Sequence, residues 1–312
     1  FANNGGTGDG DTRGSANELY KGVGDGTFTL VTGTTVSAIA SRSADAAWGD
    51  LNNDGRLDLV VANSCARNPA GHDGPACWVN EIHLQDASGQ FTRMAGTEVD
   101  TAVDAAMGHL TSSGQYQENA DESDFRGFNS MTVSLGDYDD DGFLDIFFGN
   151  QGCNQVFHNE GGTNMVLATD DCVNDFMTRD GYLQNLPICW WLKAAAREVT
   201  TAAPTTIITT FASATTPPLQ PNCDRVTSVA SGWADFDGDG RLDLFVVNNA
   251  GGDGTSHYLY RNLGGRGNFV EVSGSFNADI SLNPRALAIF DADSDGDLDL
   301  VMGSELHMFT HC

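Results

Sequence analysis

Four short segments of the chain repeat one pattern of oxygen-bearing side chains. Each reads D-x-[DN]-x-D-G-x-L-D, and we number them loop 1 (residues 50–58), loop 2 (137–145), loop 3 (235–243) and loop 4 (291–299). Side chains at the first, third and fifth positions converge on one point if the chain curls tightly, and glycine at the sixth permits that curl. The carbonyl of the seventh residue and the carboxylate of the ninth then complete the six or seven oxygens that Ca²⁺ takes at about 2.3–2.6 Å.

Each loop therefore predicts one calcium site, which makes about four sites in the chain. The expected ligands, with the seventh residue giving only its backbone oxygen, are Asp50, Asn52, Asp54, Arg56 and Asp58; Asp137, Asp139, Asp141, Phe143 and Asp145; Asp235, Asp237, Asp239, Arg241 and Asp243; and Asp291, Asp293, Asp295, Asp297 and Asp299. Asn52 lowers the charge of loop 1, so we expect weaker binding there. Clustered aspartates repel one another without a cation, so calcium is expected to be structural, with its binding energy stabilising the fold.

Other metals and another loop type fit the pattern less well. Mg²⁺ demands stricter octahedral geometry, and Zn²⁺ normally takes His or Cys, which the loops lack. An EF-hand needs a bidentate Glu at its twelfth position. That position holds Val61, Phe148, Val246 or Met302, so the EF-hand is excluded.

The residues after each loop predict the elements that position it. Short apolar runs at 59–62, 146–149, 244–247 and 300–302 are bounded by Gly, Asn or Ser and are typical of strands. Two further strands joined by a glycine-rich turn follow three of the loops, and a similar pair stands at the N-terminus. One unit is thus four strands with a loop between the first two. His83, His158 and His257 recur near the third strand, which predicts a repeated structural position.

Repeated four-stranded units predict an all-β protein with the architecture of a β-propeller. We expect a single repeat domain over residues 1–312, with units at about 1–38, 46–103, 130–171, 229–278 and 286–312. Residues 104–128 and 172–228 are interpreted as loop insertions, the second rich in Thr, Ala and Pro. The two ends carry overlapping rather than complementary part-units, which favours an incomplete or partial ring in this chain.

The pattern around the loops resembles a known repeat family. Residues 134–137 (SLGD), which run into loop 2, and 144–146 (LDI), which leave it, resemble FG-GAP/VCBS repeats. Such repeats build the propellers of integrin α subunits and of secreted adhesion-type proteins, and segment 17–29 is similar to part of the cartilage-acidic-protein-like branch. The resemblance implies that the loop aspartates are calcium ligands between the first two strands. It covers residues 17–95, 132–168 and 230–310.

Two positions depart from this family pattern. A glycine usually precedes the first aspartate of the loop, as Gly49 and Gly136 do. Ala234 and Phe290 occupy that position before loops 3 and 4.

The net charge of the chain restricts the classes of partner that it can bind. With 43 Asp and Glu against 15 Lys and Arg, the formal net charge is −28. This argues against nucleic acid and against anionic membrane surfaces, both of which are bound through basic residues. No apolar stretch approaches the roughly 18 residues of a membrane-spanning helix. The chain begins at Phe1 and is expected to be a processed or partial piece.

Seven scattered cysteines, with no CxxC pair, suit disulfides in an oxidising compartment. Cys65 and Cys77 bracket a short Pro/Gly-containing loop and are the pair that we expect to be bridged. The odd number leaves one cysteine without a partner, for which Cys312 is the natural candidate, and reduced buried cysteines are the alternative. An extracellular or cell-surface location follows from the disulfide interpretation.

No catalytic motif was found, so an enzyme is not expected. Three function classes stay open. The favoured one is a secreted calcium-dependent adhesion or scaffold module that binds a protein or glycan ligand within a larger extracellular assembly. A lectin is the second, since Trp78, Trp190 and Trp191 could stack on sugars. A polysaccharide lyase is the third.

Overall fold

The computed structural model describes an all-β protein, as the sequence predicts. The described residues are 14–66, 76–95, 97, 99, 109–110, 116–117, 129–151, 154–168, 227–249, 257–272 and 283–305. The helical element whose bounds are described is a single turn, η1 (Thr35–Ser37). Within the described part of the chain no helix has the length and apolar character needed to cross a membrane.

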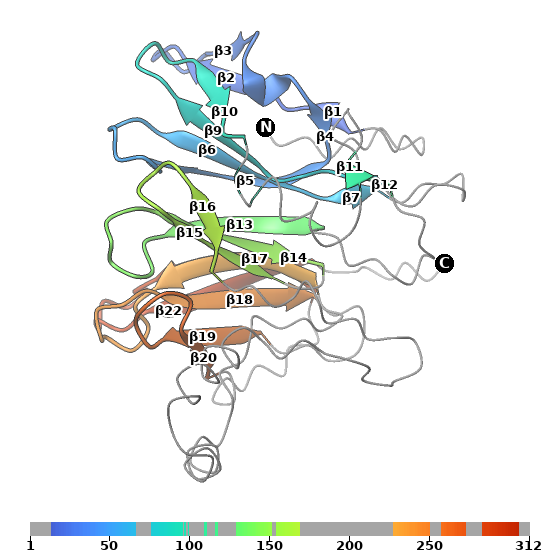
Figure 1. The fold of residues 1–312 in the computed structure, drawn as a ribbon. Helices are drawn as coiled ribbons and strands as arrows, with labels where there is room; N and C mark the ends of the chain where they lie inside the picture. The colour runs from blue at the N-terminus through green and yellow to red at the C-terminus, as the bar shows by residue number, and fades with distance from the viewer. Residues whose placement is uncertain are drawn as a thin grey trace, which may run out of the picture.

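Three four-stranded antiparallel sheets form the main part of the fold (Figure 1). Sheet 1 contains β5 (Ser43–Gly49), β6 (Asp58–Asn63), β9 (Glu81–Gln85) and β10 (Phe91–Arg93). Sheet 2 contains β13 (Ser130–Gly136), β14 (Asp145–Asn150), β15 (Gln155–Asn159) and β16 (Met165–Leu167). Sheet 3 contains β17 (Thr227–Ala234), β18 (Asp243–Asn249), β19 (Tyr258–Asn262) and β20 (Phe269–Glu271). In each sheet the strands are neighbours in chain order.

Two-stranded pairs complete the described structure. The larger two are β2 (Leu19–Gly22) with β3 (Phe28–Val31), and β21 (Asn283–Phe290) with β22 (Asp299–Glu305). The smaller pairs are β1 (Ser15–Ala16) with β4 (Ala40–Ser41), β7 (Cys65–Ala66) with β8 (Ala76–Cys77), and β11 (His109–Leu110) with β12 (Tyr116–Gln117). The β21–β22 pair repeats the first two strands of the larger sheets, with loop 4 between them.

The sheets stack face to face, with their first strands side by side. Strand β13 contacts β5 on one side and β17 on the other, and β17 in turn contacts β21. Figure 1 shows the N-terminal hairpin and sheets 1, 2 and 3 following one another from top to bottom. This arrangement is consistent with successive propeller blades, and the described residues show no closed ring.

Apolar cores fill the spaces between neighbouring sheets. Val60 and Ala62 of β6 pack with Ile146 and Phe148 of β14 between sheets 1 and 2. Other side chains of the same strands point the opposite way: Phe147 joins the core between sheets 2 and 3. Because both faces of the second strand are covered, its sequence is a continuous apolar run rather than an alternating one.

The outer faces at the two ends of the stack expose apolar side chains. Phe28 on β3 is 69% exposed, and Val301 on β22 is 52% exposed. Neighbouring sheets cover most apolar side chains of the described interior strands, although Trp48 on β5 is 48% exposed. The ends therefore have the character of blade faces without a neighbour, and the predicted partial ring stays a prediction.

The strand bounds can be compared with the predicted units. The sheets fall within or close to the predicted ranges, and β17 begins at Thr227, two residues inside the segment interpreted as the second insertion. Of that segment, 172–226 lies outside the described residues, as does most of 104–128.

Among the cysteines, Cys65 and Cys77 are paired across the β7–β8 ladder. The disulfide between them stays a prediction, and the other five cysteines lie outside the described residues.

A buried polar contact repeats at the start of each four-stranded sheet. A serine hydroxyl on the first strand donates to an asparagine on the second: Ser43 to Asn63, Ser130 to Asn150, and Ser228 to Asn248, at 2.7–2.8 Å. The backbone N–H of that asparagine donates to the side chain of Asn80, Asn154 or His257. His257 thus takes the place of an asparagine in the other sheets.

The prediction of one repeated histidine position is wrong. His83 lies two residues before the end of β9, His158 one residue before the end of β15, and His257 directly before β19. Successive strand residues point to opposite faces, so His83 and His158 occupy different environments. All three lie near the third strand, but at different positions along it.

The burial of His257 predicts how the stability of the folded protein depends on pH. Burial lowers the pKa of His257 below its ordinary value of 6.5. The unfolded chain therefore binds more protons than the folded one just below that value, and the folded protein loses stability as the pH falls. His257→Asn keeps a side-chain acceptor for the Asn248 N–H and does not titrate. We expect the variant to lose less stability than the parent between about pH 7 and pH 5 in denaturant titrations. Parallel losses in both proteins would contradict this.

Candidate metal centres

All four predicted loops adopt one backbone conformation between a first and a second strand. The carboxylate of the first residue accepts two backbone hydrogen bonds, from the fifth and sixth residues, at 2.8–3.2 Å. The sixth residue, glycine, has a positive φ, from 82° at Gly55 to 98° at Gly296. The fourth also has a positive φ, between 57° at Asn53 and 72° at Gly238. These two left-handed residues produce the curl that the pattern predicts.

The curl brings the first, third and fifth side chains together. In loops 2, 3 and 4 one carboxylate oxygen from each of the three residues lies within 4.8 Å of the others: Asp137, Asp139 and Asp141; Asp235, Asp237 and Asp239; Asp291, Asp293 and Asp295. In loop 1 the amide oxygen of Asn52 accepts the Asp54 N–H at 3.1 Å, as Asp237 does for Asp239 in loop 3. This convergence is the arrangement on which the predicted oxygen shell depends.

The ninth residue ties each loop to its sheet. Asp145 accepts the N–H of Tyr138 at 3.0 Å and that of Asn159 at 2.8 Å, and it is fully buried. Asp58 and Asp243 accept the equivalent pairs of N–H groups and are buried in the same way. The ninth carboxylate therefore joins the loop to the third strand as well as lying beside the acidic cluster.

Burial changes the proton affinity of these carboxyl groups. It raises the pKa of Asp145 to about 7, against the lowering effect of its two backbone hydrogen bonds, and the charges of Asp139 and Asp141 raise it further. The pKa of Asp58 and that of Asp243 are raised by the same cause. A buried anion without a counter-charge is costly, so a nearby cation would stabilise the charge of Asp58, Asp145 and Asp243.

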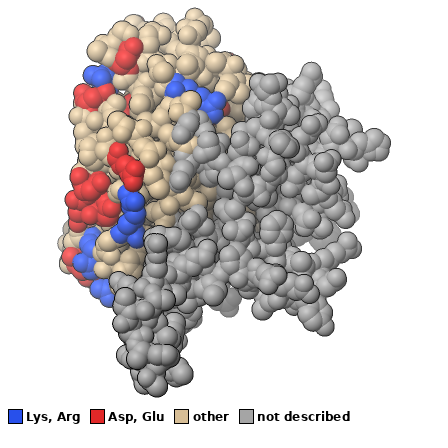
Figure 2. Space-filling view, in the orientation of Figure 1, with Lys and Arg blue, Asp and Glu red and all other residues tan. Residues whose placement is uncertain are grey.

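Arginine side chains approach two of the loops. Arg56 and Arg241, at the seventh position, pair with Asp54 and Asp239 and donate through Nε to carbonyls of the third strand at 2.9 and 3.0 Å. Arg261 of β19 pairs with Asp237 and lies 3.3 Å from Asp239. Figure 2 shows basic groups beside acidic ones along the edge where these loops lie in Figure 1. The sequence predicted only a backbone role for the seventh residue and missed these ion pairs.

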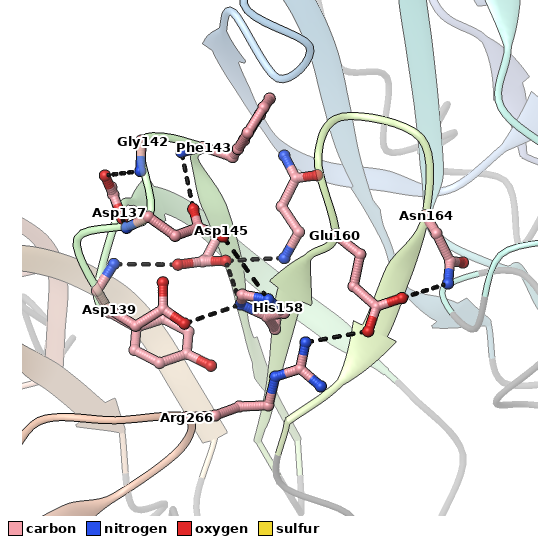
Figure 3. A network of polar contacts seen from close by, with 12 residues as sticks. Asp137, Asp139, Gly142, Phe143, Asp145, His158, Glu160, Asn164 and Arg266 are labelled. Atoms are coloured by element: carbon pink, nitrogen blue, oxygen red, sulfur yellow. Dashed lines mark hydrogen bonds and ion pairs between the residues drawn. The ribbon is translucent and has the colours of Figure 1, made fainter.

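Loop 2 has a histidine where loop 3 has Arg261. Each precedes the asparagine whose N–H binds the ninth aspartate, and sheet 1 has Leu84 at that place. His158 Nδ1 lies 3.2 Å from Asp139 Oδ2 and 3.3 Å from Asp145 Oδ1, as Figure 3 shows. Burial also raises the pKa of Asp139, and the charge of His158 opposes that effect. Aligning the third strands on Asn159 and Asn262 would have revealed His158 from the sequence.

Loop 4 differs from the others in its exposure. Every residue from 291 to 299 is exposed, whereas the ninth aspartates of loops 1 to 3 are buried. The backbone N–H of Ala292 still donates to Asp299 at 2.8 Å. The loop conformation therefore forms without the cover of a third strand in the described residues.

Two segments of the chain match a known family of repeats. The family model described as an FG-GAP-like repeat matches residues 5–61 and 235–302. These two segments of the chain are FG-GAP-like repeats. These two matches contain loops 1, 3 and 4, and loop 2 has the same conformation although it lies outside them. No curated protein matches the chain.

Neighbouring sheets are joined to one another next to the loops. Asn159 donates to the carbonyl of Leu51 in loop 1 at 2.8 Å, and Asn262 donates to that of Tyr138 in loop 2 at 2.6 Å. The side chain of Asn53 donates to the carbonyl of Gly142 at 2.7 Å, which links loop 1 with loop 2. Disorder in one loop would therefore loosen the contact between neighbouring sheets.

The glycine before the loop serves the same packing in the first two repeats. A Cβ on Gly136 would lie 2.7 Å from the ring of Trp233, and one on Gly49 would lie 2.7 Å from Leu135. The first strand of the next sheet thus needs a glycine there. Ala234 and Phe290 occupy the corresponding positions before loops 3 and 4.

Two further candidate residues, His83 and Trp78, are buried. His83 is fully buried, with Nε2 2.9 Å from Glu81 and Nδ1 3.0 Å from the Thr35 hydroxyl. Thr35 donates to the Phe91 carbonyl at 2.9 Å, so this trio fastens η1 to sheet 1. Trp78, a candidate for stacking on sugars, is buried. Trp190 and Trp191 lie outside the described residues.

Proposed function

We propose that this chain is a secreted, non-catalytic module of FG-GAP-like repeats whose loops hold Ca²⁺ and whose stacked sheets present a binding surface to a protein or glycan. The observation that carries the proposal is the repeated loop. Carboxylates at its first, third and fifth positions lie within 4.8 Å of one another in three separate sheets or hairpins. Hard oxygen donors in this number suit Ca²⁺ better than softer metals.

Calcium in this proposal supports the fold rather than a reaction. Each loop lies where neighbouring sheets meet, through contacts such as that of Asn53 with Gly142. A cation that neutralises the aspartates stabilises the loop, and through these contacts it stabilises the stack. The residues proposed as ligands are those of the four loops, including Asn52 in place of an aspartate in loop 1.

We also propose that the protein is located outside the cell and forms part of a larger assembly. The facing positions of Cys65 and Cys77 support an oxidising compartment. The exposed apolar faces at Phe28 and Val301 support contact with further repeats or partners. The net charge of −28 disfavours nucleic acid as that partner.

The experiment is a binding screen with the full chain. Immobilised protein is presented to a glycan array and to a panel of extracellular-matrix proteins, in Ca²⁺ and in excess EDTA. We expect binding to at least one matrix protein or glycan, lost on chelation. Binding confined to glycans would assign a lectin. Cleavage of a polysaccharide, seen as release of unsaturated uronates, would overturn the non-catalytic assignment in favour of a lyase.

A further inference from the structure

Loop 2 differs from the other loops because a buried imidazole enters its acidic cluster. His158 is 5% exposed and comes from the third strand of sheet 2. One ligand atom each from Asp139, Asp145 and His158 lies within 4.8 Å of the others. Figure 3 shows the ring directed toward the two carboxylates. Loops 1 and 3 have Leu84 and Arg261 at the corresponding place, so no nitrogen ligand is available there.

Two polar atoms of this cluster lack hydrogen-bond partners among the described residues. His158 Nδ1 and Asp139 Oδ1 are both buried, and neither makes a hydrogen bond with the described residues. A buried polar group without a partner costs about 1–3 kcal/mol. Nδ1 is close to two carboxylate oxygens, at 3.2 and 3.3 Å, yet poorly aligned for donating to either. Nδ1 therefore lies between two carboxylates without a hydrogen bond to either.

The separations fit ligands that share one small ion. Two ligands at the Zn–N and Zn–O distances of about 2.0–2.1 Å, placed at a tetrahedral angle, lie roughly 3.3 Å apart. The distances from Nδ1 to Asp139 and Asp145 match that value. Neighbouring oxygens around Ca²⁺, about 2.4 Å from the ion, can have similar separations, so the nitrogen ligand decides the class of metal. Imidazole with carboxylate suits divalent first-row transition metals, whereas Ca²⁺ takes oxygen ligands.

We propose that Asp139, Asp145 and His158 form a site for a divalent first-row transition metal, with Zn²⁺ as the representative ion. The site changes the proposed function at one loop: loops 1, 3 and 4 keep Ca²⁺, and loop 2 exchanges Ca²⁺ for the transition metal when both are present. Nδ1 is the nitrogen ligand, so the imidazole binds in its neutral form with the proton on Nε2. Asp141 Oδ2 lies 3.8 Å from Nε2, where it faces that proton.

The test measures both metals on the metal-free full chain. Equilibrium dialysis in saturating Ca²⁺, with and without Zn²⁺, is followed by elemental analysis of the protein. For the parent we expect four Ca²⁺ without Zn²⁺, and three Ca²⁺ with one Zn²⁺ when both are supplied. His158→Leu places the residue of sheet 1 in sheet 2. Loss of an outer-shell partner alone costs about 10- to 100-fold in metal affinity, so loss of this ligand should weaken Zn²⁺ binding at least that much and leave four Ca²⁺ bound.

A control variant and a second measurement distinguish loss of the His158 ligand from general effects of a substitution. His257→Asn removes another buried histidine, outside the cluster, and should bind Zn²⁺ as the parent does. Co²⁺ in place of Zn²⁺ should give the parent the hyperfine-shifted proton resonances of a coordinated imidazole, including an exchangeable N–H. This readout needs no variant, so it stays decisive if His158→Leu fails to fold.

The outcomes separate this inference from the proposed function. Four Ca²⁺ with no tight Zn²⁺ would overturn the transition-metal site and leave the calcium module intact. Zn²⁺ bound with equal affinity by the parent and by His158→Leu, or the absence of shifted imidazole resonances with Co²⁺, would also overturn it. One Zn²⁺ per chain that depends on His158, without Ca²⁺ in the other loops, would support the site and overturn the calcium proposal.

Discussion

Excess EDTA lowers the melting temperature of the protein by about 10 °C or more, and Ca²⁺ restores it. An ion that binds only the folded chain stabilises it by about 2.7 kcal/mol at 100 times its Kd. Three carboxylate-rich loops at that saturation would supply roughly 8 kcal/mol, against a total stability of about 5–15 kcal/mol for ordinary domains. Without a cation the aspartates of each loop repel one another. The measurement is a thermal melt followed by circular dichroism in Ca²⁺ and in EDTA.

The specificity of the effect is checked by adding back single metals. Ca²⁺ should restore the melting temperature, and Mg²⁺ at the same concentration should restore little of it, because Mg²⁺ keeps its waters and demands octahedral geometry. A melting temperature that does not change in excess EDTA would show that the loops stay folded without an ion.

Asp239→Ala removes one bound Ca²⁺ and leaves those of the other loops. Asp239 is the fifth residue of loop 3, within 4.8 Å of Asp235 and Asp237. In saturating Ca²⁺ the variant should lose about 3 kcal/mol of unfolding free energy, the linkage term of one site. In excess EDTA, where the site is empty in both proteins, the difference should fall below about 1 kcal/mol, which is the usual scale of exposed ion pairs such as those with Arg241 and Arg261.

A matched control removes a carboxylate away from the loops. Asp25 lies in the exposed β2–β3 turn, where it accepts hydrogen bonds from Thr27. Asp25→Ala should keep the full calcium count. If Asp239→Ala binds as many Ca²⁺ ions as the parent, the assignment of loop 3 is wrong.

The loops could be predicted from the sequence because their geometry is local. Nine consecutive residues contain the converging side chains, the glycine at φ near 90° and the ninth aspartate, so the spacing alone implies the curl. The all-β class followed in the same way from short apolar runs such as 146–149. These parts of the fold depend on contacts between residues that are close in the chain.

The surroundings of the loops could not be predicted from the loop motif alone because they depend on strand register. His158 reaches Asp139 only through the pairing of β14 with β15, in which Ile146 faces Phe157. A shift of one residue would turn His158 to the other face of the sheet. Arg261 reaches Asp237 through the equivalent pairing of β18 with β19. The links that Asn159 and Asn262 make between neighbouring sheets could not be predicted either. Asn262 and its partner Tyr138 are 124 residues apart in the chain, and only the stacking of the sheets brings them together.

The central claim is that the repeated loops bind Ca²⁺. Its most direct test is titration of the metal-free full chain with Ca²⁺ in a calorimeter, in buffer stripped of transition metals. We expect about four ions per chain, with loop 1 the weakest because Asn52 replaces a carboxylate. A chain that takes up no Ca²⁺, or that binds it without dependence on Asp239, would contradict the account.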